Sequence, residues 1–230
     1  SMIVDGLWDP YNNFHMGNAA ELCVKEYHFT REQQDAFAID SYQKAQKAIA
    51  SGAFKNEIAP VEIAGRKGTI VVDKDEEPFK TDFEKVPALR AAFDKAGTIT
   101  AANASKINDG AAAIVLMSEE SMKKKGLKPL AKIVAHATFA HDPKWFTTAP
   151  VGAIKKALAK AHLNTGDIDL WEINEAFANV TMAAMKDLEI PAAKVNVHGG
   201  AVAIGHPIGA SGARILTTLT HALHTHSKRY

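Results

Sequence analysis

The sequence predicts an α/β protein in which helices pack on a sheet. From Gly110 onward, short apolar runs typical of buried strands alternate with segments whose apolar residues recur at helical spacing. This alternation is typical of layered α/β domains. The first hundred residues lack it and combine helices, short β-like runs and charged loops. We therefore expect them to form a separate, loop-rich α+β unit.

The N-terminal part contains the clearest helix signature. A turn-rich loop, DGLWDPYNNFHMG, precedes a helix expected at about residues 18–27. In the helix after it, Thr30 is the predicted N-cap, Gln33 completes a capping box and Gly52 marks the C-terminal end. The runs APVEIAG and GTIVVD are β-like, and residues 73–85 are charged and irregular.

Four strands and three helices are expected after Gly97. The runs AAAIVLMS, LAKIVAHAT, DIDLWEI and KVNV are short and apolar, and turn signals bound them, which favours strands. The segments PVGAIKKALAKAHL and NEAFANVTMAAMKDL favour helices, as do residues 210–224.

Composition and charge narrow the possible functions. The 230 residues, 47% hydrophobic and 23% charged, are typical of a soluble globular protein of one or two domains. A net charge of +1 gives no indication of nucleic acid binding, and no apolar run approaches the roughly 20 residues of a membrane helix. The single cysteine, Cys23, excludes an internal disulfide framework and suits a reducing compartment. We do not expect SMIVDGLW to be a signal or transit peptide.

The glycine-rich segment NVHGGAVAIGHPIGASGARIL lies between a predicted strand and the last predicted helix. Glycine lets backbone N–H groups approach a ligand, so a phosphate cradle at the helix start is one interpretation. Neither GxxxxGK[ST] nor GxGxxG is present, however. The second interpretation is an oxyanion site, because Gly205 and Pro207 keep His206 in a rigid, non-helical setting. A histidine that only hydrogen-bonds its own loop is the alternative.

A second candidate site is the segment WEINEAFANV. Asn174 and Glu175 fall where a predicted strand meets a helix, and strand C-termini border ligand crevices in α/β sheets. Structural roles remain open, because asparagine caps helices and the helix dipole favours a first-turn carboxylate. An unrelated dinucleotide-binding domain is excluded, since no GxGxxG follows a strand with an acidic residue at the expected distance.

The segments NEAFA, VNVHGGAVAIGHPIGASGARIL, TAANASKINDGAAAIVLMS and FHMGNAAE together resemble the thiolase family, in order and over the whole chain. The finer match of DEEPFKTDFEKVP, DSYQKA and WEINEAF is to the mitochondrial-type acetoacetyl-CoA thiolases, which are acetyl-CoA acetyltransferases. The resemblance implies a layered αβαβα fold, here incomplete. It also implies interconversion of acetoacetyl-CoA plus CoA with two acetyl-CoA through a cysteine acyl-enzyme. Three regions follow from it: a loop-rich CoA-binding region at 1–97, a strand region of the N-terminal thiolase sheet at 98–120, and the C-terminal domain at 121–230.

The resemblance also implies residue roles. His206 of the GHP motif would activate the nucleophilic cysteine and help to stabilise the thioester oxyanion. Asn174 of the NEAF motif would hold a water in the same oxyanion hole. The positions that match CoA contacts are Leu7, His15, Met16, Tyr42, Lys80, Thr81, Asp82, Lys85, Phe93, Ala101, Ser105, Ala176 and Phe177.

The resemblance implies no covalent cofactor, a CoA thioester as substrate and one possible ion. Oxygen-only coordination suits a hard cation such as potassium. By their residue types alone, a solvated charged loop is the favoured interpretation of the lysines near position 80, and Tyr42 could equally lie on a helix surface. A homo-oligomer, dimer or tetramer, is expected in mitochondria, with the cytoplasm as the alternative location. The positions implied for potassium are Tyr42 and the backbone of Ala101, Ala102, Ala104 and Val202.

Both thiolase cysteines are expected to lie outside this chain. The nucleophile of the family belongs to an earlier domain, and its second cysteine belongs to a CxGG loop after the last helix. Cys23, on the apolar face of a predicted helix, is expected to be a small buried hydrophobe. We therefore expect the chain alone to be inactive and prone to association through an unpaired strand edge. The alternative function is a non-catalytic, thiolase-like protein that binds acyl-CoA or lipid.

Overall fold

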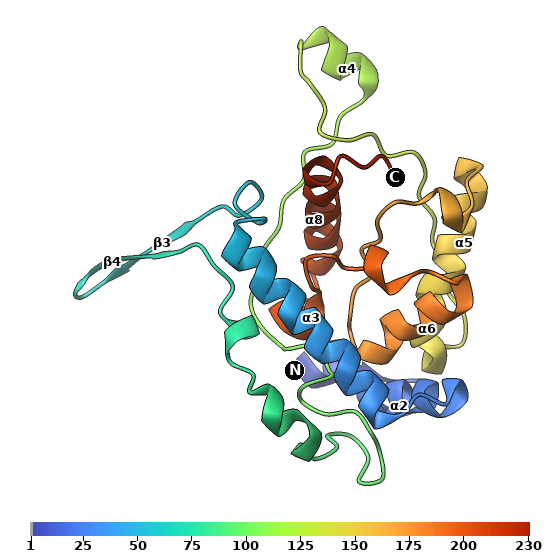
Figure 1. Cartoon of the computed structure of the whole chain (residues 1–230). Coiled ribbons are helices and arrows are strands. Elements are labelled where there is room, and N and C mark those ends of the chain that lie inside the picture. The colour runs from blue at the N-terminus through green and yellow to red at the C-terminus, as the bar shows by residue number, and fades with distance from the viewer. Residues whose placement is uncertain (1) are drawn as a thin grey trace.

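Helices are the main regular elements of the structure, a computed structural model that describes residues 2–230 (Figure 1). Two antiparallel hairpins accompany them: β1 (Trp8–Asp9) with β2 (Phe14–His15), and β3 (Val61–Gly65) with β4 (Gly68–Val72). Within the described residues, none of the helices has both the length and the apolar character needed to cross a membrane. In chain order the helices, with short 3₁₀ helices written η, are α1 (Met2–Gly6), α2 (Met16–Tyr27), α3 (Arg31–Ser51), η1 (Glu77–Phe79), η2 (Phe83–Ala88), α4 (Glu119–Lys124), η3 (Pro143–Thr148), α5 (Ala149–Ala161), η4 (Thr165–Asp167), α6 (Ala178–Leu188), η5 (Ala192–Lys194), α7 (Ala201–Ile204) and α8 (Ser211–Thr225).

The ends of α3 follow local sequence signals. The Thr30 hydroxyl accepts a hydrogen bond from the Gln33 N–H at 3.2 Å, and the Gln33 side chain accepts one from the Thr30 N–H at 2.9 Å. This confirms the predicted capping box. Gly52, with φ of 74°, terminates the helix in the left-handed region that glycine tolerates. The helices predicted at α2, α5, α6 and α8 also form, although α6 begins only at Ala178, after the NEAF motif.

Two predicted strands, AAAIVLMS and LAKIVAHAT, do not form in the described chain, so this prediction was wrong. Residues 111–118 and 130–138 run as single segments to and from α4 (Figure 1). Their apolar side chains are exposed, as the 84% exposure of Val115 illustrates. A strand needs a neighbour with which to exchange hydrogen bonds, and no segment of residues 2–230 pairs with either run.

The predicted strands DIDLWEI and KVNV are reduced to one parallel bridge between Trp171 and Val195. The Trp171 N–H donates to the Lys194 carbonyl at 2.8 Å, and the Asn196 N–H donates to the Trp171 carbonyl at 2.8 Å. The two segments therefore lie side by side, but the ladder ends at once. Asn196 adopts a left-handed φ of 44°, which turns the backbone away from an extended path.

Three apolar clusters pack the helices together. The first joins α5 and α6 to Trp171 and Val195. The second joins α2 and α6 to Ile99, and the third joins α3 to α7 through Tyr42 and Val202. The segments 171–177 and 204–207 begin at residues that belong to these clusters, so packed helices hold both segments in place.

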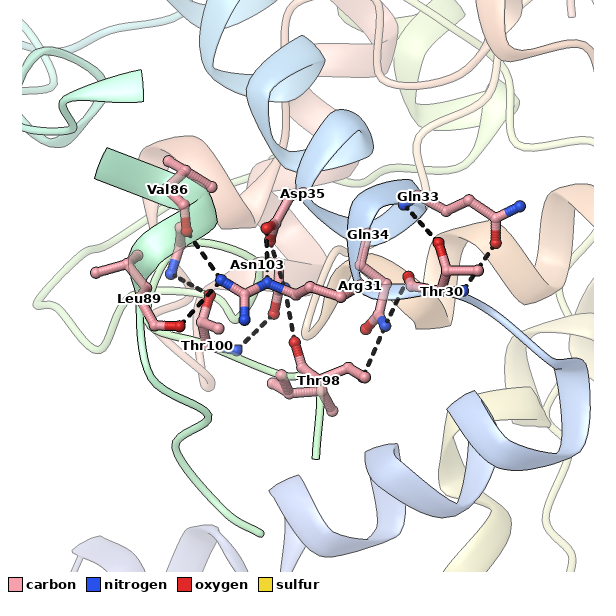
Figure 2. Close-up of polar contacts among 12 residues, drawn as sticks. Thr30, Arg31, Gln33, Gln34, Asp35, Val86, Leu89, Thr98, Thr100 and Asn103 are labelled. Carbon is pink, nitrogen blue, oxygen red and sulfur yellow. Dashed lines mark hydrogen bonds and ion pairs between the residues drawn. The ribbon is translucent and has the colours of Figure 1, made fainter. Parts of the chain in front are cut away.

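A polar network joins α3 to the loop that leads toward the site (Figure 2). Arg31 donates to the carbonyls of Val86 and Leu89 at 2.8 and 3.1 Å, and its Nε lies 2.6 Å from the carboxylate of Asp35. The other carboxylate oxygen of Asp35 accepts from Asn103 Nδ2 at 2.9 Å. Asp35 and Asn103 are buried, so these bonds fix the backbone at Asn103, just before residues 106–108, which contact the candidate site.

Candidate active site

An apolar cavity of about 440 Å³ lies where three segments meet: the end of the WEINEAF run, the GHP loop and the start of α5. His206 and Asn174 are both part of its wall, and Ala176 is the third of the predicted site residues to line it. The arrangement places an amide and an imidazole beside an apolar space that exceeds the volume of a small acyl group. The remaining lining residues are Phe146, Pro150, Ala153, Ile154, Glu172, Ile173, Val180 and Ile215.

Glycine is required in the loop that carries His206. Gly205 has φ of 100°, and a Cβ atom there would collide with the side chain of Asn108. The Asn108 amide donates to the Ile204 carbonyl at 3.2 Å, and the His206 N–H donates to the Lys106 carbonyl at 2.9 Å. The loop is therefore held against residues 106–108, and the Asn108 side chain together with the positive φ explains why a glycine occupies this position.

Both ring nitrogens of His206 have polar neighbours. Nε2 lies 3.3 Å from Nδ2 of Asn174, and Nδ1 lies 2.6 Å from Oγ of Ser211. Burial lowers the pKa of His206, and the positive charge of Arg214 lowers it further. The imidazole is therefore neutral at physiological pH and able to accept a proton. Asn174 keeps its Oδ1 buried, with no hydrogen-bond partner among the described residues.

Glu175, the second candidate of the NEAF motif, is 1% exposed and does not line the cavity. Its carboxylate accepts from Ser41 Oγ at 2.7 Å, Asn196 Nδ2 at 2.8 Å and the Val202 N–H at 3.1 Å. Burial raises the pKa of Glu175, and these three donors oppose that shift. Because α6 begins at Ala178, Glu175 is not a first-turn carboxylate and Asn174 is not its cap. Glu175 instead ties α3 and α7 to the segment that carries Asn174.

Glu172 is a cavity residue that the sequence analysis did not single out. Its side chain is 2% exposed, one oxygen lies 3.4 Å from Nη1 of Arg214, and the other has no partner among the described residues. Burial raises the pKa of Glu172 to about 8, although Arg214 opposes the shift. The sequence could have indicated that Glu172 lies at the cavity, because residues i and i+2 of an extended segment share a face. Glu172 and Asn174 have this spacing.

Glu172 makes folding stability depend on pH. The folded pKa of about 8 exceeds the ordinary value of 4.5, so the contribution is complete below about pH 4.5 and is lost as pH rises through 8. We expect the free energy of unfolding of the wild type to fall, relative to Glu172→Gln, by on the order of a few kcal/mol between pH 5 and 8.5. Urea unfolding of both proteins at several pH values measures this difference. Glu57 and Glu175 titrate in both proteins, and their negative charges contribute to the raised pKa of Glu172, so the difference between the two curves reports Glu172 together with this coupling. Parallel pH curves would contradict the assignment.

The apolar positions that match CoA contacts gather near the second cluster. His15 caps α2 and stacks on Phe93 with ring centroids 4.8 Å apart, and Phe93 contacts Phe177 edge-on at 5.8 Å. The Ser105 N–H donates to the Ala176 carbonyl at 3.1 Å. Met16 packs against the same cluster, and the Leu7 carbonyl accepts from the Met16 N–H at 2.8 Å.

The charged positions that match CoA contacts belong neither to this cluster nor to the cavity wall. Lys80 pairs with Glu77 at 2.6 Å and Lys85 pairs with Asp82 at 2.8 Å, in exposed loops at η1 and η2. Neither these lysines nor Thr81 line the cavity. The structure thus leaves them on a charged surface, paired with carboxylates that are close in sequence.

Tyr42 is fully buried, so the alternative of a helix-surface tyrosine was wrong. Its hydroxyl has no hydrogen-bond partner among the described residues. The Lys106 ammonium donates to the carbonyl of Ala101 and lies 5.6 Å from the centroid of the Tyr42 ring. Val202 packs against Tyr42, and Ala102 and Ala104 are buried on the adjoining loop. Of the residues implied for a cation, Tyr42 and Val202 share one cluster, and Lys106 connects the Ala101 carbonyl to the Tyr42 ring.

Cys23 is completely buried in α2. Burial raises the pKa of its thiol to about 11, and the nearby carboxylates of Asp187 and Glu26 add to the shift. Only about one molecule in a thousand would carry the thiolate at pH 8. Cys23 is therefore a structural residue and cannot serve as the nucleophile beside His206.

Known proteins match this chain along its whole length. The thiolase N-terminal domain matches residues 1–120, and the thiolase C-terminal domain matches residues 127–230. An acetyl-CoA acetyltransferase of Yarrowia lipolytica is 56% identical over 97% of this chain and 56% of its own length. The mitochondrial acetyl-CoA acetyltransferase of Rattus norvegicus is 52% identical over 96% of this chain and 53% of its own.

A solved structure, the Acat5 thiolase of Ascaris suum in complex with coenzyme A, superposes with a TM-score of 0.88 at 47% identity. It covers 96% of this chain, which in turn covers 57% of it. The predicted thiolase fold is therefore confirmed. The chain spans about half the length of the curated relatives it matches.

Proposed function

The chain belongs to the thiolase family, and we infer from its site that it contributes to an acetyl-CoA C-acetyltransferase. The proposed reaction interconverts acetoacetyl-CoA plus CoA with two acetyl-CoA. One observation carries the proposal: Asn174 Nδ2 and His206 Nε2 lie 3.3 Å apart at the wall of an apolar cavity. A protein that only bound acyl-CoA would have no need of this pair.

His206 and Asn174 would act in sequence on the thioester. The neutral imidazole accepts the proton of the attacking thiol, and the resulting thiolate adds to the ketone carbon of acetoacetyl-CoA. The bond between this carbon and the neighbouring CH₂ then breaks, which leaves an acetyl group on the thiol sulfur and releases the enolate of acetyl-CoA, whose negative charge lies on the thioester oxygen. That oxygen is stabilised by the N–H now present on His206 and by Asn174, directly or through a water. A proton converts the enolate to acetyl-CoA, and CoA takes the acetyl group to form the second acetyl-CoA. The thiol must come from a residue other than Cys23, which is buried and lies in α2.

We propose that the apolar positions beside this pair contact the pantetheine arm of CoA. Ala176 lines the cavity, and the Ser105 N–H donates to the Ala176 carbonyl. The rings of His15, Phe93 and Phe177 contact one another in a row that ends at Phe177, the residue after Ala176. Lys80 and Lys85 are the proposed contacts of the CoA phosphates, as point charges. Each must exchange its present carboxylate partner for a phosphate, because both are paired in the structure.

Potassium is a further ligand that we propose. The buried hydroxyl of Tyr42, which has no partner among the described residues, is an oxygen of the type that a hard cation prefers. Lys106 already donates to the Ala101 carbonyl, so a potassium ion fits only if the lysine side chain moves away. Bound potassium would supply a fixed positive charge to this loop. Equal melting temperatures in KCl and NaCl at the same ionic strength would contradict the proposal.

We also propose a homo-oligomer, dimer or tetramer, in mitochondria, with the cytoplasm as the alternative. The exposed apolar side chains of Val115, Leu116, Ile133 and Val134 support association, because a second copy could remove them from water. The mitochondrial name of the rat relative supports the compartment. Light scattering of the purified protein and localisation of a tagged protein test the two proposals separately.

The proposed reaction is tested by thiolysis of acetoacetyl-CoA. The full-length protein is incubated with acetoacetyl-CoA and CoA, and acetyl-CoA formation is followed. We expect two molecules of acetyl-CoA for each acetoacetyl-CoA consumed. Binding of acetoacetyl-CoA without any product would overturn the proposal and favour a non-catalytic acyl-CoA-binding protein.

A further inference from the structure

Ser211 contacts His206 on the side of the ring that faces away from Asn174. Its Oγ lies 2.6 Å from Nδ1 of His206 and 3.1 Å from the carbonyl oxygen of Pro207. Ser211 is 4% exposed and is the first residue of α8. Its backbone N–H also donates to Pro207 at 3.0 Å, so the helix start fixes the serine relative to the imidazole.

Counting hydrogens assigns the proton on the His206 ring. A serine hydroxyl has one hydrogen, and Ser211 donates it to the Pro207 carbonyl. With the hydroxyl hydrogen directed at Pro207, only lone pairs face Nδ1, and we assign Nδ1 as the donor of the 2.6 Å bond. At the opposite nitrogen, Nδ2 of the Asn174 amide, a donor, faces Nε2 in this amide orientation, and we assign Nε2 as the acceptor. A neutral imidazole carries one proton, and both neighbours place it on Nδ1.

We propose that Ser211 is a positioning residue that selects the Nδ1–H tautomer of His206 and so presents an unprotonated Nε2 to the cavity. This inference deepens the proposed function and rests on it for its chemical meaning. In the opposite tautomer Nε2 would carry a hydrogen and could not accept the proton of a thiol. That tautomer requires two changes: Asn174 must turn its amide by half a rotation, and Ser211 must give up its bond to Pro207.

The tautomer can be measured without any catalysis. Long-range ¹H–¹⁵N spectra of the protein labelled with ¹⁵N-histidine distinguish a protonated from an unprotonated ring nitrogen, and His206→Gln identifies the signals. We expect a protonated Nδ1 and an unprotonated Nε2 in the wild type. A protonated Nε2 in the wild type would overturn the proposal, whether or not any variant folds.

The contribution of Ser211 is isolated by Ser211→Ala, which removes the acceptor of the Nδ1–H. We expect the His206 signals to move toward the Nε2–H pattern. The matched control is Thr217→Ala, because the Thr217 hydroxyl likewise bonds to a carbonyl one turn earlier in α8, that of Ala213 at 2.9 Å. The control should keep the wild-type pattern. Unchanged His206 signals in Ser211→Ala would overturn the assigned role.

Kinetics of the full-length protein give a second readout. Ser211→Ala is expected to lower kcat by roughly 10- to 100-fold, the effect known for partners that orient metal-ligating histidines, with little change in KM. Equal reductions of kcat in Ser211→Ala and Thr217→Ala would contradict a specific role. If the wild type forms no product yet shows a protonated Nδ1, the proposed reaction fails and the tautomer assignment stands.

Discussion

Replacing His206 with alanine in the full-length protein is expected to lower kcat for acetoacetyl-CoA thiolysis by about 10²- to 10⁴-fold. The substitution removes the neutral ring nitrogen that lies at the cavity wall, 3.3 Å from the Asn174 amide. It removes the proton acceptor and one donor to the thioester oxygen together. The KM for acetoacetyl-CoA should change far less, because the apolar wall and the aromatic row remain.

The matched control for this experiment is His136→Ala. His136 is exposed and lies in the segment between α4 and η3, outside the cavity. Steady-state rates of wild type, His206→Ala and His136→Ala are compared at saturating CoA, after circular dichroism has shown that all three are folded. If His206→Ala retained more than about one tenth of the wild-type kcat, the general-base role would be wrong.

The largest effect on stability is expected at Glu175. In Glu175→Leu, the donors on Ser41, Asn196 and Val202 lose their common acceptor inside the protein. A buried donor without an acceptor costs about 1 to 3 kcal/mol. We therefore expect the free energy of unfolding to fall by about 3 kcal/mol or more, as measured by urea unfolding at pH 7.

Two further variants show whether this cost comes from the network. Glu175→Gln keeps the shape but must direct its NH₂ group at one of the three donors, so an intermediate loss is expected. Glu62→Leu alters an exposed residue of β3 and should change the stability by no more than about 0.5 kcal/mol. A loss below about 1 kcal/mol in Glu175→Leu would contradict the structural role.

Glu175 also shows where sequence reasoning reaches its limit. The motif NEAF identified a polar pair at a strand end, but the two residues have different tasks. Asn174 lines the cavity, whereas the Glu175 carboxylate accepts one hydrogen bond each from α3, from α7 and from Asn196 in the loop between η5 and α7. The partners Ser41 and Asn196 lie far away in the sequence, so no local pattern could have assigned them.

The sequence by itself determined the helices α2, α3, α5, α6 and α8, because their signals are local: the Thr30–Gln33 capping box and Gly52 at the end of α3 form as expected. It also identified the family, indicated His206 and Asn174 as candidate site residues, and indicated the buried, unreactive setting of Cys23. These conclusions depend on residue type, spacing and motif letters alone.

Tertiary structure decided the remaining questions, because they depend on contacts between distant segments. The runs AAAIVLMS and LAKIVAHAT have the composition of strands, yet a strand requires a partner and none of the described segments supplies one. Glu172 became a cavity residue, and acquired a raised pKa, only through the burial that packing against distant elements creates. The proton position on His206 likewise follows from two neighbours, Asn174 and Ser211, that the fold brings to opposite sides of one ring.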